Sequence, residues 1–300
     1  MKIPAPGRIV DGLHVWAEGR GSPTVVLEAG IAASSVSWSL VQPRVAEFTR
    51  VVSYDRAGFG WSAEAASAPT AKEAAQSLAA MLEHSGEVPP YVLVGHSFGG
   101  LIVRLFQQKF PALVAGLVLV DQVVRSDWRD ANAARLRTLE RGVLLSRRGA
   151  MLARMGIVRV CLRLLAGGAN RIPRLMARVS AGNGATVATR LATEVGKLPR
   201  AFWPAIAEHW SEARSFEAMA ENLESLPESA AQLDEQATLG DLPVIVLSAG
   251  KRIPEHDHDA ALSTRGRNIV TTNSGHWMQL DAPDAVVEAV RAVVDQVRAQ

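Results

Sequence analysis

Several features that would define the class of this protein by themselves are scarce in its 300 residues. The single cysteine, Cys161, excludes an internal disulfide framework and is typical of a reducing compartment. No apolar run reaches the roughly 18 residues that a membrane-spanning helix requires. The formal net charge is only +2, which gives no overall case for a nucleic-acid partner. Residues 1–7 also lack the apolar core of a secretion signal, so we expect a cytoplasmic protein.

What the chain has instead is an alternation of strand-like and helical segments. Hydrophobic residues make up 48% of the sequence, enough to bury the core of a large domain. Residues 8–16 are typical of an opening hairpin, and a capping box of Thr70 and Glu73 predicts a helix that Gly86 ends. The alternation predicts a mostly parallel sheet covered by helices on both faces. The strand-like runs are residues 24–27, 50–54, 91–94, 114–120, 243–248 and 268–272.

The stretch 91–100 has the most specific pattern. A short apolar run leads into Gly95-His96-Ser97-Phe98-Gly99, and the helical spacing of apolar residues resumes after it. A strand, a tight turn and a helix are the context in which Gly-x-Ser-x-Gly forms a nucleophile elbow. The turn imposes strained backbone angles on Ser97, so positions 95 and 99 need residues without side chains. We therefore predict that the Ser97 hydroxyl is a nucleophile held clear of the sheet.

Three further motifs accompany the elbow: Leu27-Glu28-Ala29-Gly30, the stretch 54–62 (Tyr-Asp-Arg-Ala-Gly-Phe-Gly-Trp-Ser), and Ser274-Gly275-His276-Trp277. In their order and spacing the chain resembles the α/β-hydrolase superfamily over almost its whole length. The resemblance implies the α/β-hydrolase fold. No strand-like run occurs in residues 123–239, so we predict a core of 1–121 and 240–300 with a helical cap, 122–239, inserted after the sixth strand.

The resemblance also implies a serine, an acid and a histidine in that chain order. His276, after the last strand, is the expected base for Ser97, because imidazole titrates near working pH. The acid is open between two positions. Asp121 directly follows its strand and would be held rigidly, whereas Asp257 would need a longer loop to fold back. We prefer Asp121 and keep Asp257 as the alternative, because a held carboxylate fixes the imidazole tautomer.

Two backbone amides are expected to hold the oxyanion that forms when a serine attacks a carbonyl. One would come from Phe98, directly after the nucleophile, and the other from Ile31, after the Gly30 that lets backbone approach closely. Glu28 stands where the family often has a histidine. We expect it to pair with a nearby arginine such as Arg56, in a stretch that we interpret as structural.

Other candidate residues are also interpreted as structural. His96 lies inside the elbow and is expected to prop the turn. Residues 256–259, His-Asp-His-Asp, resemble metal-ligand material, but adjacent positions on one loop rarely converge on one ion, so we expect a plain loop. Asp281 is expected to cap the last helix, with Pro283 in its first turn. We expect neither a metal nor a cofactor.

The predicted cap carries an uneven charge. Residues 122–180 contain thirteen arginines, no lysine and three acids, which gives a local net charge of +10. Arg171, Arg174 and Arg178 share one helical face, as do Arg159 and Arg163, and apolar residues lie between them. We prefer the interpretation that this segment is an amphipathic cap packed on the core with its arginines extended to water. The alternative is a lid that contacts an anionic membrane or an acidic, lipophilic substrate.

These observations together favour a cofactor-free serine hydrolase that cleaves a carboxylic ester of a small hydrophobic substrate through an acyl-enzyme. The serine at the elbow argues against epoxide hydrolases and dehalogenases, which use a carboxylate there. Carbon–carbon bond hydrolysis or perhydrolysis by the same residues stays open. A different class, a non-catalytic hydrolase-like receptor for a small ligand, is the lesser alternative. We expect no nucleic-acid partner.

Overall fold

The structure is a computed structural model that describes residues 5–64, 70–166, 193–234 and 237–300. Its centre is an eight-stranded sheet in the order β1-β2-β4-β3-β5-β6-β7-β8. The first two strands pair antiparallel with each other, and β2 pairs antiparallel with β4, whereas all later pairs are parallel. The strands are β1 (Arg8–Val10), β2 (Leu13–Glu18), β3 (Thr24–Glu28), β4 (Val51–Tyr54), β5 (Tyr91–His96), β6 (Val114–Val120), β7 (Val244–Ala249) and β8 (Gly266–Thr271).

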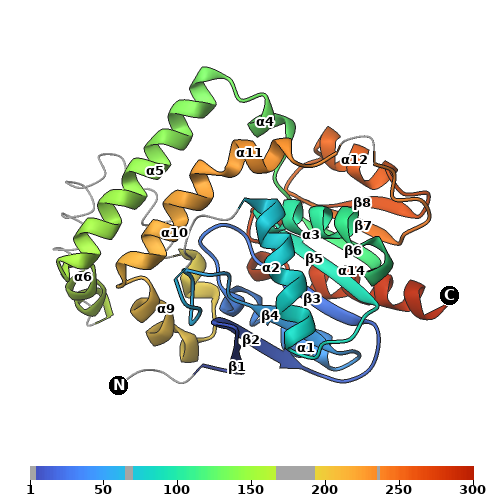
Figure 1. The fold of residues 1–300 in the computed structure, drawn as a ribbon, viewed down its shortest axis with the longest axis horizontal. Coiled ribbons are helices and arrows are strands. Elements are labelled where there is room, and N and C mark those ends of the chain that lie inside the picture. Colours follow the sequence, from blue (N-terminus) through green and yellow to red (C-terminus); the bar gives the residue numbers. More distant parts are fainter. Residues whose placement is uncertain (1–4, 65–69, 167–192, 235–236) are drawn as a thin grey trace.

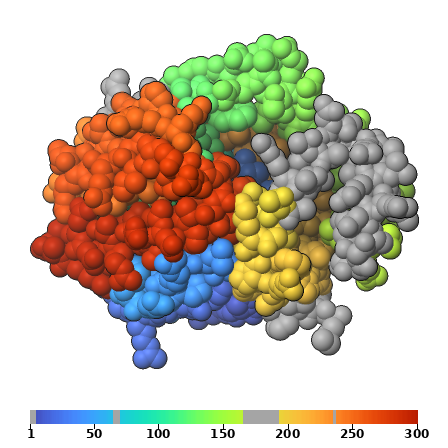
Figure 2. Space-filling view, turned by 180° about the vertical axis from the view of Figure 1, so that it is seen from behind, coloured from blue at the N-terminus to red at the C-terminus, as the bar shows by residue number. Residues whose placement is uncertain are grey.

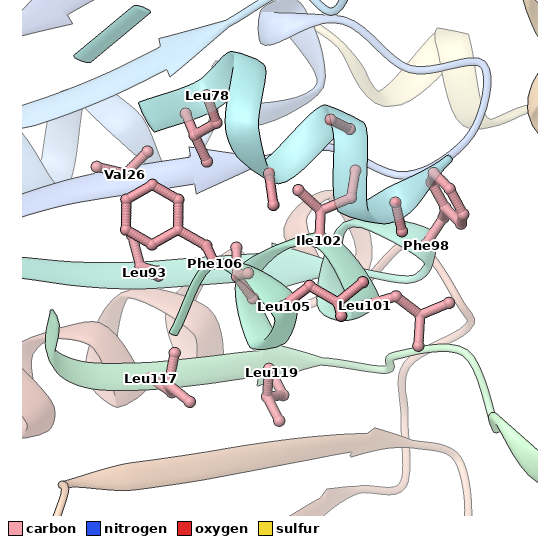
Figure 3. Close-up of a cluster of buried hydrophobic side chains, with 14 of the residues drawn as sticks. Val26, Leu78, Leu93, Phe98, Leu101, Ile102, Leu105, Phe106, Leu117 and Leu119 are labelled. Atoms are coloured by element: carbon pink, nitrogen blue, oxygen red, sulfur yellow. The ribbon is translucent and has the colours of Figure 1, made fainter. Parts of the chain in front are cut away.

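Helices cover both faces of this sheet, and each face has its own apolar layer (Figure 1). On one face α2 and α3 pack their leucine, isoleucine and phenylalanine side chains against β3, β5 and β6, as Figure 3 shows for Leu78, Ile102 and Phe106. On the other face α1 and α14 pack valines against the same strands. The core helices are α1 (Gln42–Ala46), α2 (Ala71–His84), α3 (Phe98–Lys109), α12 (Pro254–Ala261), α13 (Met278–Asp281) and α14 (Pro283–Arg298), with 3-10 turns η1 (Ser35–Trp38) and η2 (Pro111–Leu113).

Between β6 and β7 all the regular structure of the described residues is helical. The longest helix, α5, lies at the outer edge of the molecule and packs along α10 (Figure 1). No helix in the described ranges is long and apolar enough to cross a bilayer. These elements are α4 (Ser126–Arg129), α5 (Ala133–Arg154), α6 (Ile157–Ala166), η3 (Arg200–Phe202), α9 (Trp203–His209), α10 (Ala213–Glu224) and α11 (Leu226–Ala231).

The fold predicted from the sequence is confirmed: a mostly parallel sheet, covered on both faces, with a helical insertion after the sixth strand. The hairpin also forms, and Asp11 and Gly12 both have positive φ in its turn. The capping box of Thr70 and Glu73 is present at the start of α2. The exact boundaries of core and cap, 1–121 and 240–300 against 122–239, stay a prediction.

Two local predictions are wrong. Residues 256–259 are not a loop but part of α12, because Pro254 and the acids after it favour a helix start. Asp281 does not cap the last helix; the cap position belongs to Ala282, and Asp281 ends the short helix α13. Pro283 occupies the first turn of α14 as expected. Arg171, Arg174 and Arg178 lie outside the described residues.

Candidate active site

The elbow at the end of β5 places Ser97 in a strained backbone conformation. Its φ is 54° and its ψ is −120°, between the last residue of β5 and the first of α3. A Cβ on Gly95 would lie 2.5 Å from the Gly99 carbonyl oxygen, and a Cβ on Gly99 would lie 2.5 Å from the backbone carbonyl oxygen of Glu28. Both glycines are therefore required by the close approach of strand, turn and helix. The strain holds the Ser97 side chain at the carboxyl edge of the sheet.

Three side chains from three strand ends form a hydrogen-bonded chain at this edge. The Ser97 Oγ lies 3.0 Å from Nε2 of His276, and Nδ1 of His276 lies 2.6 Å from Oδ2 of Asp121. Ser97 follows β5, Asp121 follows β6 with a positive φ of 40°, and His276 lies after β8. The His276 side chain is 50% exposed and that of Asp121 only 12%, so the imidazole faces solvent over a held carboxylate.

The Asp121 carboxylate has a second partner on the neighbouring strand. Its Oδ1 accepts a hydrogen bond from the Ala249 amide at 3.0 Å. Burial acts to raise the pKa of Asp121, but its hydrogen bonds with His276 and Ala249 outweigh burial and lower this pKa. The alternative acid, Asp257, is on α12, where it pairs with Arg252 and accepts from Asn268. The structure brings Asp121, and not Asp257, to the histidine.

The amides of Ile31 and Phe98 lie in the two segments that meet at Ser97. A Cβ on Gly30 would lie 3.2 Å from the Ser97 Cβ, which shows how closely the segment before Ile31 approaches the elbow. Phe98 opens α3, where backbone N–H groups have no partner within the helix. Within the described part of the chain neither amide forms a hydrogen bond. Both donors are available for an anion beside the Ser97 hydroxyl.

A buried arginine holds the segment before Ile31. Arg56 donates to the carbonyl oxygens of Ala29 and Gly30, each at 2.6 Å, and to Glu28 at 2.5 Å. The Gly30 carbonyl and the Ile31 N–H belong to one planar trans peptide, so they point in opposite directions. By holding the carbonyl, Arg56 turns the Ile31 N–H away from itself. The Glu28–Arg56 pair was expected, but the contact with both carbonyls has no signature in the sequence.

The Glu28 carboxylate completes this buried cluster. Its second oxygen accepts a hydrogen bond from the Tyr54 hydroxyl, and its side chain is fully buried. Burial raises the pKa of Glu28, and the charge of Arg56 and the Tyr54 hydroxyl oppose that rise. Asp55 does not pair with the adjacent Arg56; it contacts the His14 imidazole instead. The two consecutive charged residues after β4 thus have different partners.

His96 props the loop that carries His276. Its Nε2 lies 2.8 Å from the His276 carbonyl oxygen, and the Gln279 amide lies 3.3 Å from its Nδ1. The carbonyl requires the proton on Nε2, so Nδ1 accepts from Gln279. Burial is the largest cause that lowers the pKa of His96 to about 3, and the proximity of His276 adds to it. His96 is therefore neutral at neutral pH and does not compete as a base.

A second support of the histidine loop was not predicted. The Gly275 amide donates to Oδ2 of Asp281 at 2.9 Å, and the other Asp281 oxygen pairs with Lys197 from the inserted helical region. Figure 2 shows the yellow segment around residue 200 against the red C-terminal part of the chain. Leu198 packs there with Leu280 and Val36. The inserted region thus contacts the loop that carries His276.

The residues around this contact are mostly apolar. Trp61 and Trp277 of the core and Phe202 and Ile206 of the insertion pack on the cluster of Val36, Leu198 and Leu280. A small recess, with room for about one water-sized molecule, lies between residues 32–34 and α9. Its lining includes Phe59, Ile206, His209 and Trp210. The contact between the core and the inserted region is therefore formed mainly by packed apolar side chains.

The residues that resemble metal ligands are occupied by structural contacts. The buried His256 bonds through Nδ1 with the Ser248 hydroxyl at 2.8 Å and through Nε2 with the Gln122 carbonyl at 3.0 Å. Asp259 pairs with Arg104. Over the described ranges no three His, Cys, Asp or Glu side chains gather as a metal site would require.

Comparisons with known proteins agree with this architecture. The sequence profile of the Alpha/beta hydrolase family matches residues 25–289. Lipase LipV of Mycobacterium tuberculosis is 36% identical over 121 residues, which are 40% of this chain and 44% of the lipase. The matched segments of the curated relatives span only 15% to 44% of those proteins' own lengths.

Solved structures are similar over nearly the whole chain. A thermophilic esterase from Thermogutta terrifontis superposes with a TM-score of 0.62 at 20% identity, over 95% of this chain and 93% of the esterase. The epoxide hydrolase CorEH superposes with a TM-score of 0.64 at 17% identity, over 97% of this chain and 98% of the hydrolase. At these identities the likeness establishes the fold, and proteins of this fold differ in chemistry.

Proposed function

Because the chain belongs to the α/β hydrolase family, we propose that it hydrolyses carboxylic esters of small hydrophobic substrates through an acyl-enzyme on Ser97. The single observation that carries this proposal is the chain of hydrogen bonds from Ser97 through His276 to Asp121. Donor amides beside a serine, with an imidazole that is itself held by a carboxylate, are the groups that acyl transfer needs. A carboxylate nucleophile, as in epoxide hydrolases, is replaced here by a hydroxyl.

In the proposed reaction the Ser97 oxygen attacks the ester carbonyl while Nε2 of His276 takes the hydroxyl proton. Asp121 keeps the other imidazole proton on Nδ1 and stabilises the imidazolium that forms. The Ile31 and Phe98 amides donate to the carbonyl oxygen as it becomes negative. His276 then gives its proton to the leaving alcohol. Water, deprotonated by the same imidazole, attacks the acyl-enzyme and releases the acid.

Arg56 has a positioning role in this mechanism. Its guanidinium holds the Ala29 and Gly30 carbonyls, and so sets the direction of the Ile31 N–H before substrate arrives. The buried carboxylate of Glu28 compensates the charge of Arg56. An uncompensated buried charge would be strongly destabilising, so the pair acts as a unit.

The proposal is tested by labelling with a fluorophosphonate, which reacts with activated serines. Wild type should react and Ser97→Ala should not. Ser248→Ala is the matched control, because the Ser248 hydroxyl also contacts an imidazole, that of His256, but is fully buried. Equal labelling of wild type and Ser97→Ala, or no labelling of folded wild type, would show that Ser97 is not an activated nucleophile.

The substrate class is tested with esters of increasing acyl length. The apolar contact between the core and the inserted region supports a preference for medium or bulky hydrophobic groups over acetate. Initial rates on purified protein should rise from acetate to medium acyl chains. A steady fall of kcat/KM with acyl length would contradict the hydrophobic substrate, and inactivity on all esters with retained labelling would point to another acyl or carbon–carbon bond.

A further inference from the structure

Apart from Leu139, the buried residues of α5 are small, and several of its large apolar residues are exposed. Its inward face packs closely on α10: a Cβ on Gly149 would lie 2.4 Å from the Phe216 ring, and one on Gly142 would lie 3.3 Å from Leu223. Large side chains would not fit between the two helices. The residues on the inward face are accordingly small: Gly142, Ser146, Gly149, Ala150 and Ala153. The larger apolar side chains of α5 are therefore not all accounted for by packing on α10.

The opposite face carries a continuous exposed row. Its spacing of four and three residues alternates, so all six members lie on one side of the helix over about 27 Å. Leu144 is 48% exposed, Met151 53% and Met155 65%. Three exposed arginines belong to the same row: two precede Leu144, and the third lies between Leu144 and Met151. We call this row the outer stripe: Arg137, Arg141, Leu144, Arg148, Met151 and Met155.

The arginines of the outer stripe differ from their neighbours on the same helix. Arg147 pairs with Glu224 and Arg154 with Glu217, both on α10. Arg135 pairs with Asp127. Within the described residues Arg137, Arg141 and Arg148 have no acidic partner. The positive charge of the outer stripe is thus uncompensated, whereas the arginines of the adjacent face form ion pairs at the protein surface.

From this arrangement we propose that the outer stripe binds the surface of an anionic lipid bilayer. The stripe belongs to α5, which lies at the outer edge of the molecule, where a flat partner can reach it (Figure 1). Arginine stems can lie beside Leu144, Met151 and Met155 at the level of the acyl boundary while the guanidiniums reach lipid phosphates. Exposed apolar side chains on the same row as arginines without an acidic partner match the acyl boundary and the phosphates of such a surface. The proposal goes beyond esterase activity and does not depend on it.

The test is co-sedimentation of the full chain with vesicles. Vesicles of phosphatidylcholine with about one third phosphatidylglycerol should bind wild type at low salt, and pure phosphatidylcholine should not. Each arginine near an anionic surface strengthens binding about fivefold, so the triple variant Arg137→Gln, Arg141→Gln, Arg148→Gln should bind about a hundredfold more weakly. Salt should also weaken the binding of wild type, because it screens exposed charges.

A matched triple variant isolates the stripe from net charge. Arg135→Gln, Arg147→Gln and Arg154→Gln remove the same charge from the same helix, but from arginines that have acidic partners. This variant should keep most of the wild-type binding. Equal loss in the two triples, or no binding of wild type to the anionic vesicles, would overturn the proposal.

The apolar half of the stripe has its own variant, Leu144→Gln with Met151→Gln and Met155→Gln, which keeps helix-favouring side chains of similar length. Binding should fall at least about tenfold, because apolar insertion is lost while the charge is kept. Unchanged vesicle binding would overturn the bilayer proposal and leave a purely electrostatic surface, as an acidic protein would use. The circular dichroism spectrum and the melting temperature should stay close to those of wild type in all three variants, which checks their folding.

Discussion

The carboxyl edge of the sheet and the outer face of α5 both carry charged residues at regular positions, yet they differ in what holds those residues. At the sheet edge each side chain has one place: Ser97, Asp121 and His276 are tied to each other and to backbone groups. On α5 the arginines and methionines of the outer stripe face solvent. A residue that directly follows a strand therefore has its side chain held in one place. An amphipathic pattern, by contrast, shows only which residue types share a helix face.

The largest loss of activity is expected from a substitution of Asp121. Asp121→Asn keeps the size of the side chain but cannot hold the imidazole in the required tautomer, so kcat should fall by up to about ten-thousandfold with an unchanged fold. Asp257→Asn should stay near wild type, because Asp257 contacts Arg252 and Asn268 and not His276. Steady-state kinetics on one ester with circular dichroism as the folding control measures both. The reverse result would place the acid after β7.

The strand ends explain how much of the site the sequence could predict. Gly95 and Gly99 mark the elbow, Asp121 directly follows an apolar run, and His276 follows the last one. Parallel strands bring their carboxyl ends to one edge, so these residues meet whatever the rest of the chain does. The choice between Asp121 and Asp257 depended on the loop after β7, which is a helix in the structure and turns Asp257 toward Arg252 and Asn268.

What the sequence could not give are contacts between segments with no local pattern. Arg56 reaches two carbonyls of a loop 26 and 27 residues earlier, and Lys197 reaches Asp281 84 residues later. The same limit applies to α5, where the sequence showed apolar residues among arginines but not which face was buried. Gly142 and Gly149 decide that question, since they permit the close approach of α10. In a sequence, a glycine inside a helix indicates only a lower helix propensity, and it does not show which face of the helix is buried.

The next effect concerns Arg56, which sits just after β4, while Arg50 sits just before it. Arg56→Lys keeps the charge but loses the fork that holds Gly30, Ala29 and Glu28 together, so the Ile31 amide is no longer fixed. We expect kcat to fall about ten- to a hundredfold with KM changed less than about threefold, part of the loss seen when an oxyanion donor is removed. Kinetics with two ester substrates measures the split.

Arg50→Lys is the control for that experiment. Arg50 forms a two-point ion pair with Glu87 at the opposite end of the same strand, with distances of 2.6 and 3.0 Å. Both variants weaken an ion pair at an end of β4, but only Arg56→Lys should lower kcat. A similar kcat loss in the two variants, or a change confined to KM, would assign Arg56 a structural role alone.

The third prediction uses the buried imidazole beneath the site. His96 has a pKa lowered from 6.5 to about 3 in the folded protein, chiefly by burial. Above pH 6.5 it is neutral in both states; as pH falls from 6.5 toward 3, only the unfolded chain gains its proton. Folding stability should therefore fall by about 1.4 kcal/mol per pH unit from this group. Urea unfolding from pH 7.5 to 4.5 should show a shallower decline for His96→Gln, and parallel curves would contradict the assignment.

The smallest effect is expected where the two regions touch. Lys197 pairs with Asp281, which also accepts from the Gly275 amide next to His276. In Lys197→Met the Asp281 carboxylate keeps its bond to Gly275, so the loop loses one restraint and not its position. A partly exposed ion pair contributes at most about 1 kcal/mol, which corresponds to a kcat about two- to fivefold lower. Arg44→Met removes the exposed pair with Asp284 on α14, which has no hydrogen bond to the histidine loop in the described part of the chain, and should leave kcat unchanged. Because salt screens such pairs, the kcat of wild type should approach that of Lys197→Met at high ionic strength. Equal rates at low salt would mean that the inserted region contacts the loop without restraining it.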